Sequence, residues 1–178
     1  LPKMAWKARQ CWSLSVRCRF HSTVKLSILA LGHRMPGWVQ AGFEEYTRRM
    51  PPEARVELIE LKPEDRASKT VDRVLALEGA RIDAAVPRNA ERIVLDERGT
   101  SLTTAMLAGW LREWMDLGVS PCFIIGSADG IAPAVKQSAR RTIALSGCTL
   151  PHGMVRVMLA EQLYRAWSLH NNHPYHRE

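Results

Sequence analysis

Residues 121–130 read Pro-Cys-Phe-Ile-Ile-Gly-Ser-Ala-Asp-Gly, an apolar run that ends abruptly in a loop bounded by two glycines. Five consecutive apolar residues without polar alternation predict a strand that is buried on both faces. Gly126 and Gly130 predict a turn directly after it. Strands buried on both faces are typical of parallel sheets that lie between helices. This stretch therefore predicts the α/β class.

The rest of the chain repeats that pattern on both sides of the stretch. Apolar runs predict strands, and segments with helical spacing of apolar residues predict helices between them. Strand and helix alternate throughout, which predicts a mostly parallel sheet with helices on both faces and one domain over residues 25–178. The expected strands are 26–31, 56–61, 92–96, 121–125 and 142–145, and the expected helices are 37–49, 71 to before Pro87, one capped by Ser101 or Thr103, 132–140 and 153–169.

Net charge does not by itself identify a partner. The 178 residues carry a formal charge of +7, but five of the 25 Lys and Arg lie in residues 1–24, which contain no acid. The remaining chain therefore has 20 basic and 18 acidic side chains, a surplus of +2. An RNA partner must consequently be argued from a site, although a basic chain is compatible with one.

Cysteine spacing and hydropathy bear on the compartment. None of the four cysteines forms a CxxC pair, which favours a reducing, cytoplasmic setting over a disulfide framework. No apolar run reaches the ~20 residues that cross a bilayer, so we expect no membrane partner.

Residues 1–24 differ from the rest in being basic, acid-free and Ser-bearing. One interpretation is an organellar transit peptide. The other, which we favour, is translated upstream sequence with the true start at Val24, because the run from Lys25 to Gly32 resembles the very beginning of a domain. Under either interpretation, residues 1–24 lie outside the fold.

Three strand ends carry the residues that predict a ligand site. The segments 95–99, 126–130 and 145–151 each follow a predicted strand, and each contains glycine. In open α/β sheets, ligands bind beyond the carboxyl ends of the strands, and glycine lets the backbone approach a ligand closely. These loops are compatible with a nucleoside pocket and equally with ordinary turns. Neither GxGxxG nor the Gly-Lys-Ser/Thr motif is present, so a dinucleotide or kinase-like site is not supported.

The last 28 residues contain a second group of polar side chains. Four of the six histidines lie there: His152, His170, His173 and His176. The spacing of the last three matches no common zinc site, and Pro174 interrupts the helix that would align them, so we expect no metal. The alternative to a site is a solvated tail. Arg165 has an i,i+4 partner in Glu161, which leaves Arg156 as the better candidate for contact with RNA.

Short motifs occur along residues 25–178. Near the start they are Lys25 to Gly32, Met35-Pro36 and Trp38-Val39. The most specific series is Ile125-Gly-Ser-Ala-Asp-Gly130, Ala144-Leu-Ser146, Thr149-Leu-Pro-His152, Val155-Arg-Val157, Glu161-Gln-Leu-Tyr-Arg-Ala166 and His173-Pro-Tyr-His-Arg-Glu178. Together these motifs resemble the RlmH family, SPOUT-class methyltransferases of large-subunit ribosomal RNA.

The resemblance implies a fold, a cofactor and a reaction. The fold is a SPOUT domain with a C-terminal trefoil knot, in a homodimer whose last helices pack together. The reaction is methylation of N3 of a pseudouridine in large-subunit ribosomal RNA, on assembled ribosomes. The cofactor is S-adenosylmethionine, and the family's cofactor positions fall on Leu95, Gly126, Leu145, Ser146, Gly147, Cys148, Thr149 and Leu150.

An N3–H acceptor must lose its proton near methyl transfer, which calls for a base or a polarising group. His152, Tyr175 and His176 are candidates for the base, and Arg156 and Arg177 for stabilising negative charge or phosphate. A non-catalytic ribosome- or nucleotide-binding module is the competing interpretation, with a metal-dependent hydrolase as a third.

One residue departs from the family pattern. Ser127 stands where the family usually has a second glycine, and serine resists a positive φ more than glycine does. A loop that needed such a conformation at this position would bind the cofactor more weakly. Because Gly126 remains, we expect the serine to be tolerated.

Overall fold

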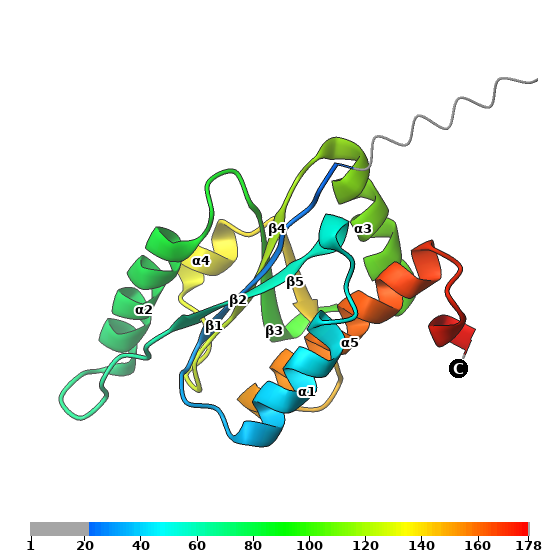
Figure 1. Ribbon diagram of the computed structural model, residues 1–178. Helices are drawn as coiled ribbons and strands as arrows, with labels where there is room; N and C mark the ends of the chain where they lie inside the picture. Colours follow the sequence, from blue (N-terminus) through cyan, green and yellow to red (C-terminus); the bar gives the residue numbers. More distant parts are fainter. Residues whose placement is uncertain (1–21, 178) are drawn as a thin grey trace, which may run out of the picture.

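The computed structural model describes residues 22–177, with side chains as far as Tyr175. Our interpretations of residues 1–21 therefore lie outside the described residues. The described chain forms one five-stranded sheet in the order β2-β1-β4-β3-β5, and every neighbouring pair is parallel. Figure 1 shows the sheet between two groups of helices, which confirms the predicted class. The strands are β1 (Leu26–Leu31), β2 (Val56–Leu61), β3 (Glu91–Ser101), β4 (Pro121–Ile125) and β5 (Arg141–Ala144).

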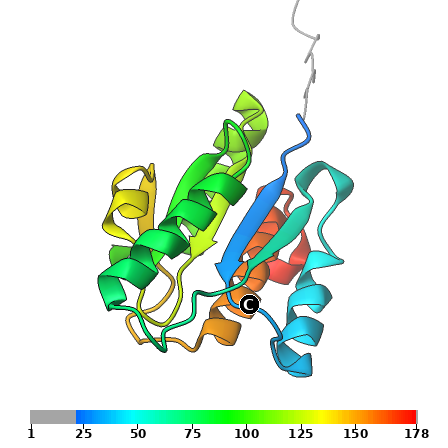
Figure 2. The ribbon, with the colours of Figure 1, turned by 90° about the vertical axis from the view of Figure 1, so that its left-hand side faces the viewer.

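Helices cover both faces of the sheet. Apolar side chains of α1, α3 and α5 share one core cluster with one face of the sheet, and those of α2 and α4 share a second cluster with the other. Figure 2 shows these layers from the side of α2 and α4. The helices are α1 (Gly37–Thr47), α2 (Val71–Ala85), α3 (Thr104–Leu117), α4 (Pro133–Gln137) and α5 (His152–His170), with the 3₁₀ turns η1 (Pro52–Ala54) and η2 (Pro174–Arg177).

The two ends of α3 follow from local chemistry. Thr103 is the N-cap, because its hydroxyl accepts a hydrogen bond from the Met106 amide at 3.2 Å. Gly118 ends the helix with a φ of 65°, the left-handed conformation that glycine adopts without penalty. Of the two expected caps Thr103 is therefore correct, and Ser101 instead ends β3.

The end of β3 differs from the prediction. We expected a strand ending at Asp96 and a loop over 97–101, but β3 runs on to Ser101. Its pairing with β5 shifts between Leu95 and Thr100, which both lie opposite Ile143, so the residues between them bulge from the sheet. Gly99 permits this bulge, because a Cβ there would lie 2.5 Å from the Ile143 carbonyl carbon.

The beginning of the domain lies slightly before the expected boundary. Val24, which we placed outside the fold, is fully buried, and its amide donates to the Glu53 carbonyl at 2.8 Å. None of the helices within residues 22–177 has the length and apolar content that crossing a bilayer requires.

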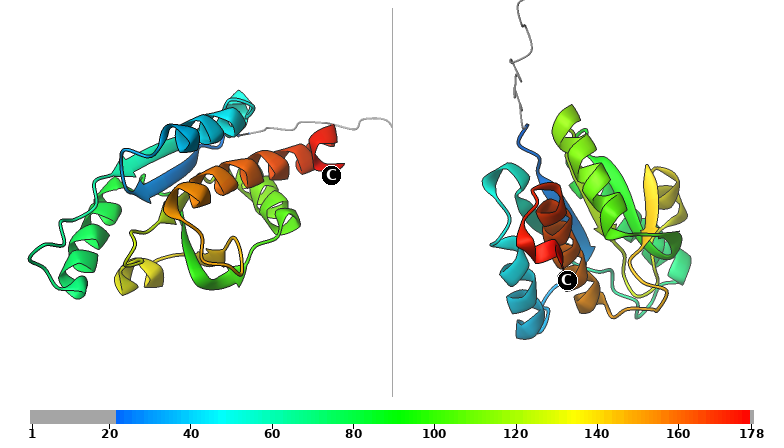
Figure 3. Two further views of the ribbon diagram at one scale, coloured as in Figure 1. Left: turned by 90° about the horizontal axis from the view of Figure 1, so that it is seen from below. Right: turned by 90° about the vertical axis from the view of Figure 1, so that its right-hand side faces the viewer.

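The last helix lies between two earlier ones. Loop 145–151 passes across the end of β3, and α5 then packs between α1 and α3 (Figure 3). This return of the chain is the region where the family resemblance implies a trefoil knot, and the knot stays a prediction.

Candidate functional site

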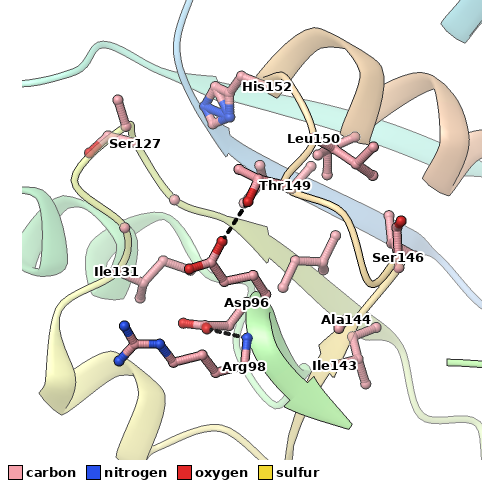
Figure 4. Close-up of a pocket in the computed structure, with 18 of the residues that line it drawn as sticks. Asp96, Arg98, Ser127, Ile131, Ile143, Ala144, Ser146, Thr149, Leu150 and His152 are labelled. Carbon is pink, nitrogen blue, oxygen red and sulfur yellow. Dashed lines mark hydrogen bonds between the residues drawn. The ribbon is translucent and has the colours of Figure 1, made fainter. Parts of the chain in front are cut away.

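A cavity of about 680 Å³ lies at the carboxyl ends of β3, β4 and β5. This size suits a small-molecule or cofactor ligand. The wall is made by the three expected loops together with the first turn of α5 and one residue of α4 (Figure 4). Its members include Leu95, Asp96, Glu97, Arg98, Gly126, Ser127, Asp129, Gly130, Lys136, Leu145, Ser146, Cys148, Thr149, Leu150, His152 and Val155.

Seven of the eight expected cofactor positions line this cavity, and only Gly147 is not among the lining residues. The loop after β5 is held from within, because the Cys148 amide donates to the Ser146 hydroxyl at 3.0 Å. The backbone groups of Gly147 and Leu150 form no hydrogen bond with any residue that the structure describes. Polar backbone at the mouth of a cavity is what a purine ring needs for recognition.

The loop after β4 is a tight turn. The Ser127 amide donates to the Gly130 carbonyl at 3.2 Å, and the Gly130 amide donates back to the Ser127 carbonyl at 3.0 Å. A Cβ on Gly126 would lie 2.4 Å from Cγ1 of Ile131 and 2.5 Å from the Gly130 carbonyl oxygen. Glycine is therefore required at 126 by close packing.

Ser127 fits this turn without strain. Among the described non-glycine residues a positive φ occurs only at Arg34, Asn89 and Asn172, so Ser127 does not need the conformation that glycine favours. Its hydroxyl donates to the Glu78 carboxylate at 2.7 Å, and the second oxygen of this buried carboxylate accepts from the Glu64 amide at 3.0 Å. The departure from the family pattern is thus accommodated, and the serine ties the turn to α2.

Acidic side chains from the β3 bulge form the opposite wall. Asp96 pairs with Lys136 of α4, a wall residue that sequence reasoning missed because α4 has only five residues and no motif. Burial alone would raise the pKa of Asp96, but hydrogen bonds from Lys136 and from the Arg98 amide lower it overall. Glu97 accepts a hydrogen bond from the Thr149 hydroxyl at 3.0 Å and so joins two walls (Figure 4).

His152 lies at the edge of the cavity, in the first turn of α5. Its Nε2 faces the Leu31 carbonyl at the end of β1. A carbonyl only accepts, so this contact assigns the proton to Nε2 and leaves the lone pair on Nδ1. Burial, followed by the charge of Arg156, lowers the pKa of His152, so the ring is neutral near pH 7.

Arg156 is buried beneath that edge, with a side chain that is 1% exposed. Its Nη1 donates to the Glu60 carboxylate at 2.5 Å, and its Nη2 donates to the Gly32 carbonyl at 2.9 Å. Both terminal nitrogens of the guanidinium are therefore used within the fold, while Nε has no hydrogen-bond partner among the described residues. Within one subunit Arg156 holds the ends of β1 and β2, and its expected contact with RNA stays a prediction.

The C-terminal candidates lie elsewhere in the subunit. The η2 turn folds back on α5, where the Tyr175 hydroxyl donates to Glu161 at 3.2 Å and its ring lies 4.8 Å from the ring of Tyr164. Glu161 is two and a half helical turns beyond His152, or roughly 14 Å along the helix axis. Burial, followed by the charge of Glu161, raises the pKa of Tyr175 to about 12.

In the tail, His173 and Tyr175 are partly buried against α5, whereas Asn171, Asn172 and Pro174 are exposed. The fold of one subunit does not bring Tyr175 to the cavity. The backbone of His176 and Arg177 belongs to η2, and their side chains lie outside the described part of the chain. Within that part, no three His, Cys, Asp or Glu side chains gather as metal ligands would.

Comparison with known proteins defines the class. A family model described as "Predicted SPOUT methyltransferase" matches residues 24–176. The chain belongs to the SPOUT methyltransferase family, as the sequence resemblance indicated. Among its relatives are proteins named Ribosomal RNA large subunit methyltransferase H from Burkholderia mallei (strain SAVP1) and Burkholderia pseudomallei (strain K96243). Each is 57% identical over 155 residues, which cover 86% of this chain and 99% of the relative.

Proposed function

We propose that this chain uses S-adenosylmethionine to methylate N3 of a pseudouridine in large-subunit ribosomal RNA, on assembled ribosomes. The observation that carries the proposal is the cavity at three parallel strand ends, whose wall contains seven of the eight positions at which the family resemblance puts the cofactor. The named relatives, aligned over nearly their whole length, support the RNA substrate.

The residues present fit S-adenosylmethionine. The tight turn at Gly126 and the free backbone groups of Gly147 and Leu150 suit a nucleoside, while the carboxylates of Asp96, Glu97 and Asp129 suit a sulfonium cation. We expect Leu95, Gly126 and the run 145–150 to hold it. When bound, the cofactor supplies an activated methyl group, and the protein contributes orientation and electrostatics.

His152 is the best candidate in this subunit for moving the acceptor proton. Its ring is neutral, partly buried and at the cavity edge, with the Nδ1 lone pair not used by the Leu31 contact. Tyr175 keeps its proton at neutral pH because its pKa is raised, so it acts as a hydrogen-bond donor rather than as a base.

The separation of His152 from the tail supports a homodimer. If Tyr175, His176 and Arg177 act at a cavity, that cavity belongs to another copy. On α5, Met154 is 37% exposed, and Val155, Val157 and Leu169 are only partly buried, so this helix offers apolar surface for a second α5. We therefore propose that the last helices of two subunits pack together.

We place the folded unit at residues 24–178 and its reaction in the cytoplasm, where bacterial ribosomes are found. A transit peptide in residues 1–24 would move that reaction to an organelle. Fractionation of cells that express the full-length chain distinguishes the two.

The test is methyl transfer to purified ribosomes whose large-subunit RNA lacks the modification. We expect the full chain to transfer label from methyl-labelled S-adenosylmethionine to that RNA, and mass spectrometry of the digested RNA to identify N3-methylpseudouridine. The Gly126→Ala variant is the matched control, because the added methyl group collides with the turn. A chain that bound ribosomes but transferred no label would be a binding module, and label on another base would refute the proposed acceptor.

A further inference from the structure

The connection between β1 and α1 contains an unusual backbone conformation. Arg34 has a φ of 58°, and its side chain is exposed. A left-handed conformation is strained for any L-residue, because it brings the Cβ too close to the following carbonyl oxygen. Such residues concentrate at ligand-binding sites, where the surrounding structure holds them in place. The position of Arg34 therefore calls for a functional reading.

Arg34 lies on the side of the sheet where the cavity opens. It follows the carboxyl end of β1, and β1 is paired with β4, with Ala30 opposite Ile125. The end of β1 also contacts the first turn of α5 through Leu31 and His152. The connection is thus flanked by the turn after β4 and by the start of α5.

Lys62 lies on the neighbouring strand end. The Gly32 amide donates to the Leu61 carbonyl at 2.8 Å, so the chain segments that lead to Arg34 and Lys62 leave the sheet side by side. The Lys62 side chain is exposed. Two cations therefore follow the carboxyl ends of the adjacent strands β1 and β2. The cavity lies at the carboxyl ends of β3, β4 and β5 in the same sheet.

Three acidic groups around these cations already have cationic partners. Glu60 pairs with Arg156, Glu64 with Lys69 and Arg81, and Asp129 with Arg66 at 3.1 Å. Asp65 accepts a hydrogen bond from the Ala67 amide at 3.1 Å and offsets one of the two cations only in part. Within residues 22–177, the Arg34 guanidinium and the Lys62 ammonium form no ion pair or hydrogen bond. Arg34 and Lys62 are thus a local positive surplus in a domain whose overall surplus is only +2 over residues 25–178.

We propose that Arg34 and Lys62 bind backbone phosphates of the ribosomal RNA and so position the target nucleotide over the cavity. The inference rests on the proposed function for its substrate. Phosphate contacts of this kind set the register of a nucleic acid without reading its sequence. Arg is suited to this because its fork of donors binds phosphate in a bidentate manner.

Three substitutions at position 34 separate charge from backbone strain. Arg34→Ala removes the charge and keeps the strain, Arg34→Gly removes both, and Arg34→Lys keeps the charge. Lys62→Ala tests the second cation. The matched control is Arg88→Ala. Arg88 is also exposed and forms no ion pair with a described residue, but it precedes β3, at the opposite edge of the sheet.

The measurements are KM for ribosomes at several salt concentrations, kcat, the Kd of S-adenosylmethionine and the melting temperature. For Arg34→Ala, Arg34→Gly and Lys62→Ala we expect KM to rise about fivefold, with a log–log salt slope shallower by about one. Saturating kcat and cofactor Kd should stay near wild type. Arg34→Lys should raise KM less than Arg34→Ala does, because it keeps the charge but loses the bidentate fork, and Arg88→Ala should keep the wild-type KM. Arg34→Gly should melt above Arg34→Ala because glycine relieves the strain.

Two results overturn the inference, and they are distinguishable. Wild-type KM and salt slope in Arg34→Ala and Lys62→Ala, with an active wild-type enzyme, would contradict phosphate binding alone. A wild-type chain that neither methylates ribosomes nor sediments with them would remove the proposed function and this inference together.

Discussion

The two ends of α5 differ in what they bury. The first turns carry a polar network in which His152 and Arg156 hold the ends of β1 and β2 through Leu31, Gly32 and Glu60. The last turns carry an aromatic cluster instead, in which the Tyr164 ring lies 6.0 Å from that of Trp167 and 4.8 Å from that of Tyr175. The first end shapes the cavity, and the second end anchors the tail.

This difference shows how the candidate catalytic residues are distributed. His152 and Arg156 lie at the first end of α5, and the tail candidates follow its last end in η2. A rigid helix of 19 residues separates the two sets. Both sets act in one reaction only if the tail of one copy reaches the cavity of another. The proposed roles of both sets of residues therefore require a dimer. Changes at the two ends of α5 test this requirement.

Removal of the tail should have the largest effect on activity. A chain that ends at Asn172 lacks Tyr175, His176 and Arg177 but keeps the cavity. We expect methyl transfer to ribosomes to fall by about 100-fold, the scale of a lost acid–base or charge-stabilising group, with little change in cofactor Kd.

Mixing this truncated chain with the Gly126→Ala variant sharpens the test. A mixed dimer pairs an intact cavity with an intact tail, so we expect recovery of roughly a quarter of wild-type activity under random assortment. A mixture no more active than its components would show that each subunit works alone.

The same substitution at each end of α5 should change stability unequally. Arg156→Met keeps the apolar stem but leaves Glu60 and the Gly32 carbonyl without their partner, and we expect a loss of about 2 kcal/mol in the free energy of unfolding. Arg165→Met removes a partly exposed i,i+4 pair with Glu161 and the contact of the guanidinium with the Tyr175 ring at 4.9 Å, and it should cost about 1 kcal/mol. Denaturant titration measures both free energies of unfolding. Equal losses in the two variants would contradict the structural role of Arg156 in holding the ends of β1 and β2.

Tyr175→Phe isolates the anchoring bond of the tail. It removes the hydroxyl that donates to Glu161 and leaves the ring on Tyr164. We expect a loss of about 1 kcal/mol in unfolding free energy, because one partly buried hydrogen bond is lost. A melting curve that matched wild type would mean that the aromatic contact alone holds the tail.

The pH dependence of stability should show the smallest effect, at the first end of α5. Because the pKa of folded His152 is lowered from 6.5, the unfolded state binds its proton first as the pH falls. His152 therefore contributes stability above pH 6.5 that is lost as the pH falls through the lower folded pKa. The difference in unfolding free energy between wild type and His152→Gln, measured from pH 8 to pH 5, should fall with pH. A constant difference would contradict the shift.

The sequence predicted the sheet and most of the cavity because both depend on local patterns. Apolar runs such as residues 121–125 and glycines after strands are visible without tertiary information. The extension of β3 past Asp96 was missed, because the polar stretch Glu97-Arg-Gly-Thr-Ser101 has the composition of a loop and rejoins β5 only through a long-range register shift.

The burial of Arg156 and the position of the tail depend on the fold as a whole. Arg156 resembles a surface cation on its helix, and its burial follows from Glu60, 96 positions earlier in the chain. The distance between His152 and the tail follows from the uninterrupted length of α5. The sequence of that helix does not indicate whether a tail residue acts at the cavity of its own subunit or at that of another copy.

The decisive experiment for the cavity is calorimetric titration of S-adenosylmethionine into the full chain, with Gly126→Ala as control and oligomeric state measured alongside. We expect saturable binding at one site per subunit of a dimer. In the variant binding should be lost or strongly weakened, because a Cβ at 126 would lie 2.4 Å from Ile131. A folded chain that bound no cofactor, or a variant that bound it as tightly as wild type, would contradict the assignment of this cavity as the methyl-donor site.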